Sequence, residues 1–390
     1  MTSAPIPPRK ELSPRARLVL GLLFFALGGA SLWLYGGRAE REQVELQGAA
    51  MGTTWSVKLA DPGLDAAAQR AAADAIAERL ERVDRLMSTW KPDSELSRFN
   101  AHEGTDSFAL SPETYAVLEI AQRVAEESGG AFDVTVGPLV DAWGFGSEGR
   151  REPPAGPVLR ALRERTGWRK LALGPLGRTV RKSRPDVRVD LSAVAKGYAV
   201  DLVARGLESA GRERFLLEVG GELRASGERP GGGAWRVAIE APDAPADARR
   251  VHRVVELRDV SMATSGDYRN YYERDGRRLS HTIDPRTGHP IEHRLASVSV
   301  IHPEAAWADA WATALDVLGP EEGYSLAASK GLPAYFLVRD AALPSMDGAP
   351  SGGTGASGEA SFTVRMTREF EPYLAQDAPA PAPAGIGSRP

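Results

Sequence analysis

The stretch Val189-Asp-Leu-Ser-Ala-Val-Ala-Lys-Gly-Tyr-Ala-Val-Asp201 turns from a strand-like pattern into a helical one. Val187-Arg-Val-Asp-Leu191 alternates like a strand, and the helix is expected to close at Gly211. Free N–H groups at the start of such a helix, with Lys196 in the first turn or so, suit the diphosphate of a nucleotide. Asp190 at the strand end could accept hydrogen bonds from a heterocycle or ribose. Taken alone, the segment fits an ordinary strand–helix connection with a solvated lysine better.

The flanking sequence adds further helices and strands. Residues 64–90 and Tyr115–Glu127 carry apolar side chains at helical spacing. Strand-like alternation recurs at Trp55–Leu59, Phe132–Val136 and Phe215–Val219. The chain is therefore expected to fold as a mixture of α and β elements.

Composition excludes several classes of function. The net charge of -4 and the pI near 6.0 give no general attraction to nucleic acid, so no nucleic-acid partner is expected. The chain has no cysteine, which excludes disulfides, a thiolate nucleophile, a zinc–thiolate site and an N-terminal lipid-modified cysteine. Its chemistry must use oxygen and imidazole groups.

The N-terminal segment predicts a membrane anchor. Residues 18–37 carry no charge and are long enough to span a hydrocarbon core of roughly 30 Å. Four basic residues within positions 1–17 predict a cytoplasmic N-terminus. A cleaved signal peptide is the alternative, but its apolar region usually runs about 7–15 residues. We expect an uncleaved single-pass anchor in the inner membrane, with the catalytic domain in the periplasm.

Three segments outside the predicted core lack regular patterning. Arg150–Gly156 and Ser345–Ser361 read as surface loops. The Ala/Pro-rich tail at 377–390 is expected to be disordered, because it cannot bury enough apolar area to offset the entropy of ordering.

Two polar motifs suggest metal and proton chemistry. Asp309 and Thr313 lie four residues apart in the helical stretch Trp307–Leu315, so both oxygens share one face and could meet one Mg²⁺. Such pairs are common on helices, and a solvated or capping pair is the commoner explanation. His281 precedes the turn that ends at Gly288, where it could accept a proton from a hydroxyl nucleophile or only bond the turn.

Glycine-rich segments could admit a flat ligand. Gly129–Pro138 and Trp143–Gly146 place Asp133 and aromatic side chains among glycines that allow close backbone approach. Glycines that only punctuate turns, with aromatics in the core, explain each segment equally well.

Taken together, these segments resemble the FAD:protein FMN transferase (ApbE) family, both in their order along the chain and in their amino-acid sequence. The likeness covers roughly residues 48–340. It rests on Met51–Trp55, Met87–Trp90, Ser94–Asn100, Gly130–Gly146, Val189–Gly197, Glu218–Gly221, Ala263–Tyr268, His281–Gly288 and Ala308–Thr313.

The resemblance implies an α+β fold of duplicated antiparallel sheets with helices, similar to a T-fold, in a catalytic domain over residues 48–370. FAD would lie between the two halves. The implied FAD contacts are Met51, Trp90, Ala131, Phe132, Asp133, Asp190, Lys196 and Ile283. The implied metal shell is the carbonyl of Ala193 with the side chains of Asp309 and Thr313.

This chain departs from the family pattern in two places. Some relatives have a second carboxylate just before the metal-binding threonine, where this chain has Ala312, so the FAD diphosphate must complete the shell. Many relatives are tethered through a cysteine, and here the span at 18–37 would replace that tether.

The resemblance implies Mg²⁺-dependent transfer of FMN from FAD to a Thr or Ser hydroxyl of a target protein, with AMP leaving. His281 is the expected base, while Lys196 and Mg²⁺ would offset charge on the phosphates. The expected acceptor is a flavoprotein subunit of a membrane redox complex. Two alternatives stay open: an FAD diphosphatase that uses water, and a non-catalytic periplasmic FAD-binding protein.

Overall fold

A computed structural model describes residues 43–61, 63–146, 152–242, 250–266, 271–274, 277–340 and 361–375. The predicted cytoplasmic segment at 1–17, the anchor at 18–37 and the tail at 377–390 lie outside these ranges, as does most of the loop at 345–361. No helix within the described ranges combines the length and the apolar character needed to cross a bilayer.

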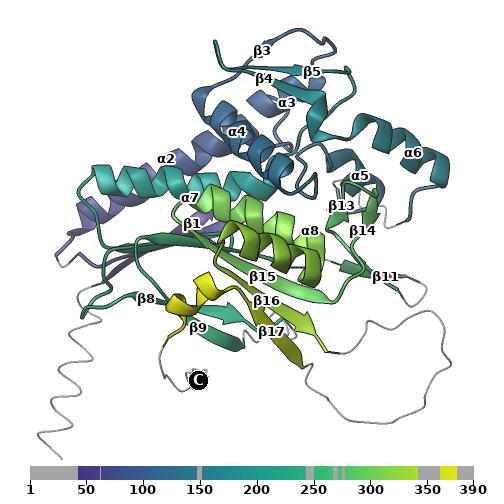
Figure 1. Cartoon of the computed structure of the whole chain (residues 1–390). Helices are drawn as coiled ribbons and strands as arrows, with labels where there is room; N and C mark the ends of the chain where they lie inside the picture. The colour runs from purple at the N-terminus through teal and green to yellow at the C-terminus, as the bar shows by residue number, and fades with distance from the viewer. Residues whose placement is uncertain are drawn as a thin grey trace, which may run out of the picture.

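The centre of the molecule is one eight-stranded sheet in which every neighbouring pair is antiparallel (Figure 1). Four neighbouring strands come from residues 44–226 and the other four from residues 260–366, so the two expected sheets are joined edge to edge. In spatial order the strands are β1 (Val44–Ala50), β2 (Thr53–Leu59), β6 (Phe215–Val219), β7 (Glu222–Ser226), β10 (Val260–Gly266), β15 (Leu295–His302), β16 (Ala334–Arg339) and β17 (Phe362–Met366).

Four small sheets surround the large one. They are β3–β5–β4 (Phe108–Ala109, Thr179–Lys182, Leu171–Gly174), β8–β9 (Trp235–Glu240, Val251–Leu257), β11–β12 (Tyr271–Arg274, Arg277–Ser280) and β13–β14 (Ile283–Asp284, His289–Pro290). The helices of the described ranges are α2 (Ala66–Met87), α3 (Glu95–Ala101), α4 (Pro112–Glu127), α5 (Gly137–Ala142), α6 (Gly156–Arg165), α7 (Ser192–Ser209) and α8 (Ala305–Lys330), with 3-10 turns η1 (Trp168–Lys170) and η2 (Arg368–Tyr373).

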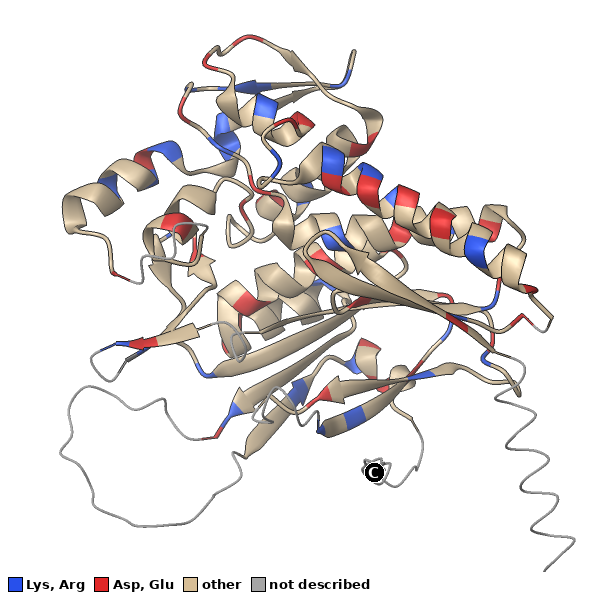
Figure 2. Cartoon of the chain, turned by 180° about the vertical axis from the view of Figure 1, so that it is seen from behind, with Lys and Arg blue, Asp and Glu red and all other residues tan. Residues whose placement is uncertain are grey.

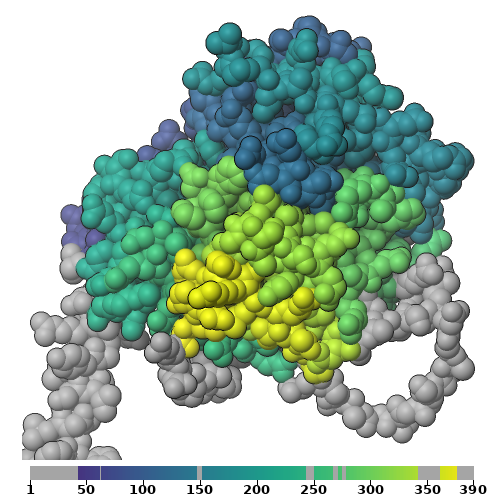
Figure 3. All heavy atoms as spheres, viewed as in Figure 1, coloured from purple at the N-terminus to yellow at the C-terminus, as the bar shows by residue number. Residues whose placement is uncertain are grey.

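The large sheet is covered on both faces, and its strands alternate accordingly. On β16, Phe336 packs into the main core with α7 and α8, whereas Tyr335 and Leu337 pack into a second core with the β8–β9 hairpin and η2. A period of two is what a strand buried on both sides requires. Helices therefore lie on one face and the hairpin on the other (Figure 1). The segment 361–375 closes the surface beside α8 (Figure 3).

The described part of the surface carries acidic and basic side chains close together. The solvent face of α2 alternates acidic and basic residues (Figure 2). This face of α2 therefore presents no basic patch.

The local patterns predicted some of these elements. The strands at Trp55–Leu59 and Phe215–Val219 are confirmed, as are the helices within 64–90 and 115–127. The helix after Leu191 is also confirmed, and Gly211 follows it with a left-handed φ of 74°.

Two predicted strands, Phe132–Val136 and Val187–Leu191, are wrong. The Asn100 side chain takes the place of a neighbouring strand: its amide donates to the Val189 carbonyl at 2.8 Å and accepts the Val189 N–H at 2.7 Å. The two irregular segments meet through one backbone bond, from the Asp190 N–H to the Val134 carbonyl at 2.7 Å. The alternation of apolar residues in both segments correctly indicated burial, but the segments do not pair with strands of a sheet.

Close packing of α7 against α8 positions the residues described below. A Cβ on Gly197 would lie 2.3 Å from the Ala305 carbonyl oxygen, so only glycine permits this approach. Asp201, one turn further along α7, accepts the N–H groups of Ala305 at 2.7 Å and Ala306 at 2.9 Å. The first turn of α8 is therefore capped by α7.

We predict that Gly197→Ala destabilises the fold by about 1–3 kcal/mol, because the new methyl group overpacks a backbone contact that cannot yield. Gly206→Ala on the same helix is the matched control: its Cβ would meet only the flexible Arg79 guanidinium. The control should be neutral or gain up to about 1 kcal/mol from helix propensity. Urea unfolding measures both, and equal stabilities would contradict the packing argument.

Candidate functional site

A cavity of about 380 Å³ lies where α7 begins, beside α8 and the two irregular segments. Ten predicted site residues line it: Ala131, Phe132, Asp133, Asp190, Ala193, Lys196, His281, Ile283, Asp309 and Thr313. The other two, Met51 and Trp90, line a neighbouring pocket of about 430 Å³. Both pockets share Asp190, Ser192 and Lys196. The structure therefore brings all the predicted site residues into two connected pockets.

The neighbouring pocket offers an aromatic surface to a ligand. Trp90 follows α2 and is 75% exposed, an unusual position for the largest apolar side chain. Met51 stands in the tight turn between β1 and β2 with a φ of 52°, a conformation that non-glycine residues rarely adopt. An exposed tryptophan at the mouth of a pocket is suited to stacking on a flat ring.

Two buried carboxylates and one lysine meet at the junction of the pockets. The Lys196 ammonium donates to Glu222 Oε1 at 2.5 Å. Burial, and then the charge of Asp309, raises the pKa of Glu222 to about 8. Burial also raises the pKa of Asp309. Burial alone would lower the pKa of Lys196, but Asp309 and Glu222 raise it. Ionised, the cluster carries one excess negative charge, which favours an added proton or cation.

Glu222 was missed by the sequence reasoning. It is the first residue of β7 and directly follows Glu218–Gly221, a segment that entered the analysis of the sequence only as part of the family resemblance. Among the residues that the structure describes, no side chain or backbone group bonds its buried Oε2 atom. The only available signal was its place after a glycine pair, which does not reveal burial.

Asp309 and Thr313 project from one face of α8 into the cavity, as their spacing predicted. Asp309 Oδ2 accepts the Gly197 N–H at 3.0 Å, and Thr313 Oγ1 lies 3.3 Å from Ser265 Oγ. In a regular helix this same N–H would bond the Ala193 carbonyl. The carboxylate competes with the Ala193 carbonyl for this N–H, and a carbonyl oxygen has two lone pairs with which it could take a further ligand.

These oxygens do not by themselves form a dense metal cluster. Over the described part of the chain, no group of three or more His, Asp or Glu side chains is placed to hold a metal ion. A cation here would need backbone, hydroxyl and ligand oxygens beside the carboxylates, a mixed shell that Mg²⁺ accepts.

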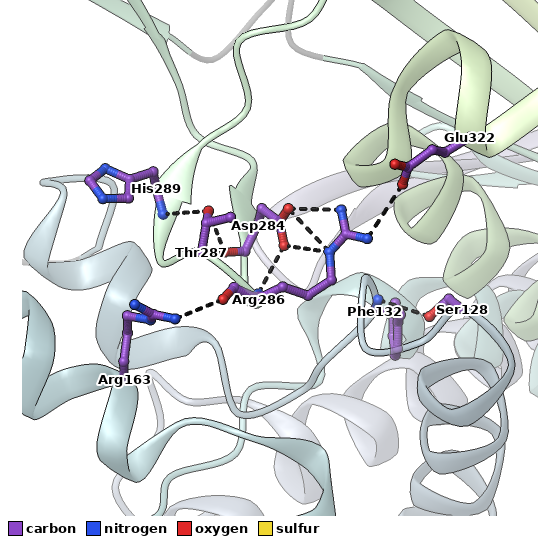
Figure 4. Close-up of polar contacts among 8 residues, drawn as sticks. All are labelled: Ser128, Phe132, Arg163, Asp284, Arg286, Thr287, His289 and Glu322. Atoms are coloured by element: carbon purple, nitrogen blue, oxygen red, sulfur yellow. Dashed lines mark hydrogen bonds and ion pairs between the residues drawn. The ribbon is translucent and has the colours of Figure 1, made fainter.

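The Asp133 carboxylate is occupied by the protein itself. Its Oδ1 accepts the Thr135 N–H at 2.8 Å and the Thr135 hydroxyl at 2.6 Å, while Oδ2 accepts the Trp168 N–H at 2.7 Å. Burial raises its pKa despite these donors. Ser128 Oγ accepts the Phe132 N–H at 3.1 Å and fixes the start of the segment (Figure 4). The Asp133 side chain thus shapes the cavity wall, and the backbone is left to contact a ligand.

His281 follows β12 and faces the cavity beside Phe145, with ring centroids 6.3 Å apart. The next residue is anchored, since the Thr282 hydroxyl donates to Asp316 Oδ2 at 3.1 Å. Asp284, the other nearby candidate base, is engaged by the Arg286 guanidinium at 2.8 Å. Of the two, His281 lines the cavity and Asp284 does not.

The turn after His281 is held rigidly (Figure 4). Arg286 bridges Asp284 to Glu322 of α8, 3.5 Å away, and its carbonyl accepts a bond from Arg163 of α6 at 3.0 Å. These contacts join three elements distant in sequence. They fix the backbone on which His281 and Ile283 stand.

We predict that Glu222→Gln changes how stability depends on pH. A carboxyl whose folded pKa is about 8, against an ordinary 4.5, contributes stability that is complete below pH 4.5 and is lost as the pH rises through about 8. Between those values the wild-type protein should lose unfolding free energy relative to Glu222→Gln. Urea unfolding across this range measures the difference, and parallel curves would contradict the assigned protonation.

Comparison with known proteins agrees with this geometry. The ApbE family profile matches residues 51–336. An FAD:protein FMN transferase of Vibrio cholerae is 44% identical over 313 residues, covering 80% of this chain and 92% of the relative, and that of Escherichia coli K12 is 41% identical over 304 residues, covering 77% and 85%. The structure of the flavin transferase ApbE from Vibrio cholerae superposes with a TM-score of 0.73 at 40% identity, covering 85% of this chain and 99% of that one. The chain belongs to the ApbE family.

Proposed function

We propose that this protein transfers FMN from FAD to a Thr or Ser hydroxyl of a target protein and releases AMP. The observation that carries the proposal is the meeting of two pockets at Lys196, with Asp309 and Glu222 beside it. A dinucleotide needs two sites for its two halves and a cationic group where its diphosphate lies between them. The names of the relatives at 44% and 41% identity support the same reaction.

The step is a phosphoryl transfer. The acceptor oxygen attacks the FMN-side phosphorus, a new phosphoester bond forms, and the bond to the bridging oxygen breaks as AMP leaves with that oxygen. His281 takes the hydroxyl proton. Lys196 offsets negative charge on the phosphates as the leaving group separates. Atoms and charge balance without an oxidant or reductant.

Mg²⁺ fits the donor set on α7 and α8. The Ala193 carbonyl, Asp309 and Thr313 would hold it, and all three line the cavity. Bound there with the diphosphate, the ion would supply charge neutralisation and orientation. Since Ala312 supplies no second carboxylate, the protein offers few charged ligands, and the excess negative charge of the buried cluster compensates in part.

We propose the same setting as the sequence predicts. The span at 18–37 would anchor the chain in the inner membrane, and the described fold would lie in the periplasm. The acceptor would be a flavoprotein subunit of a membrane redox complex. These proposals rest on the sequence, because residues 1–42 lie outside the described ranges.

The products of one incubation test the function. The protein is mixed with FAD and Mg²⁺, with and without a host membrane extract from a strain that lacks this protein, and AMP and flavin-labelled protein are quantified. We expect AMP and labelled protein in equal amounts, both only with extract, and FMN-phosphothreonine or FMN-phosphoserine peptides by mass spectrometry. AMP with free FMN in both arms would show a diphosphatase. Intact bound FAD in both arms would show a non-catalytic binder.

We predict that His281→Ala binds FAD nearly as well as the wild type but transfers FMN about two to four orders of magnitude more slowly, the usual contribution of a general base. His289→Ala is the matched control, because this exposed histidine lies on the same turn and does not line the cavity. FAD fluorescence titration and single-turnover labelling separate the two effects. Loss of FAD affinity with an unchanged rate per bound FAD would make His281 a binding residue.

A further inference from the structure

A third pocket reaches the same lysine from the opposite face of the large sheet. It has a volume of about 670 Å³ and shares Lys196, Glu222, Thr264 and Gly266 with the main cavity. With the Met51–Trp90 pocket it shares only Lys196. Lys196 therefore lines all three pockets, and the site proposed for FAD accounts for two of them.

This third pocket, here called the hairpin groove, lies between the large sheet and the β8–β9 hairpin. Its floor includes Leu216, Leu223 and Met262, which belong to the core on the hairpin side. One wall is the hairpin strand β8, with Ala238 exposed on it. Helices α7 and α8 cover the other face of the sheet (Figure 1). A molecule in the groove would thus approach Lys196 from the side away from these helices.

The strands part where the groove meets the cavity. β10 pairs with β7 only from Val260 to Met262, yet it continues to pair with β15 as far as Gly266. Among the described residues, Thr264–Gly266 therefore have a strand neighbour on one side only. Thr264 and Gly266 line both the groove and the cavity. An open strand edge of this kind can pair with the backbone of an extended peptide.

The charges of the groove suit a polypeptide. Its lining includes Arg236 and Arg250 together with Glu218 and Glu240. Mixed charge of this kind fits neither a nucleic acid nor an anionic lipid surface, both of which favour basic residues. A polar peptide with an open backbone matches both the mixed charge and the strand edge.

We propose that the hairpin groove receives the acceptor protein, with an extended segment lying along Thr264–Gly266 and its Thr or Ser hydroxyl directed toward the Lys196 end. This inference rests on the proposed function and adds the route of the acceptor. A nucleophile cannot enter through pockets that FAD fills, and the groove provides a separate approach to the same phosphates. The partner class is a protein segment that is extended when bound and carries a Thr or Ser.

The absence of cysteine from this chain permits a direct test. Ala238→Cys, in the groove, and Arg253→Cys, exposed on the same hairpin outside the groove, are each labelled after folding with a polyethylene glycol maleimide. Labelling after folding removes the risk that the variant misfolds. Ala238→Trp is a second variant that fills the groove without a label. The probe acceptor is a synthetic pool of thirteen-residue peptides with random flanks and a central Thr, mixed with FAD and Mg²⁺.

We expect labelled Ala238→Cys and Ala238→Trp to lose at least tenfold in the rate of peptide flavinylation while FAD affinity stays within twofold. Labelled Arg253→Cys should match the wild type in both. Weaker FAD binding in the groove variants would overturn the proposal, because the groove would then hold part of FAD. Unchanged flavinylation would also overturn it and would place the acceptor elsewhere. If the wild type flavinylates neither the peptides nor the membrane extract, the proposed function itself is wrong.

Discussion

The bond from the Gly197 N–H to the Asp309 carboxylate, 3.0 Å long, is the contact on which the rest of the site depends. It joins α7 to α8 at a point where no side chain larger than hydrogen fits. The close approach places Lys196, next to Gly197, beside Asp309, and puts Thr313 one turn further along α8. The same bond competes for the helical partner of the Ala193 carbonyl. One polar contact between two helices thus brings the Lys196 ammonium group close to the proposed metal ligands.

Burying that contact is costly, and the cost explains the chemistry of the site. Burial of two carboxylates beside one ammonium group disfavours the ionised form of both, so the pKa values of Glu222 and Asp309 rise. A ligand that brings positive charge to this cluster would change its charge balance. In the proposed reaction the diphosphate and Mg²⁺ arrive together. In the proposed acceptor route, the divergence of β7 and β10 matters because Lys196 and Glu222 line pockets on both faces of the sheet.

Sequence reasoning succeeded where the determinant is local. Asp309 and Thr313 share a face because four residues make about one helical turn, and the α7 start follows from the pattern after Leu191. It failed where the determinant is distant. The Val187–Leu191 segment is extended without being a strand because its partner is the side chain of Asn100, and no pattern within the segment encodes that. Glu222 was missed because its burial and its pairing with Lys196 depend on how α7 packs against β7. The neighbouring segment Glu218–Gly221 matches a family motif, but a motif match does not reveal which side chains are buried.

We propose that α7 and α8 hold Mg²⁺ together with the FAD diphosphate. The increase in FAD affinity that Mg²⁺ causes tests this proposal. Calorimetric titration with FAD is run with Mg²⁺ and with a chelator, on the wild type and on Asp309→Asn, whose amide oxygen can still accept the Gly197 N–H. We expect Mg²⁺ to raise the affinity of the wild type for FAD at least about tenfold, equivalent to about 1.4 kcal/mol. Asp309→Asn should bind FAD without this increase. An undiminished increment in Asp309→Asn would contradict the account.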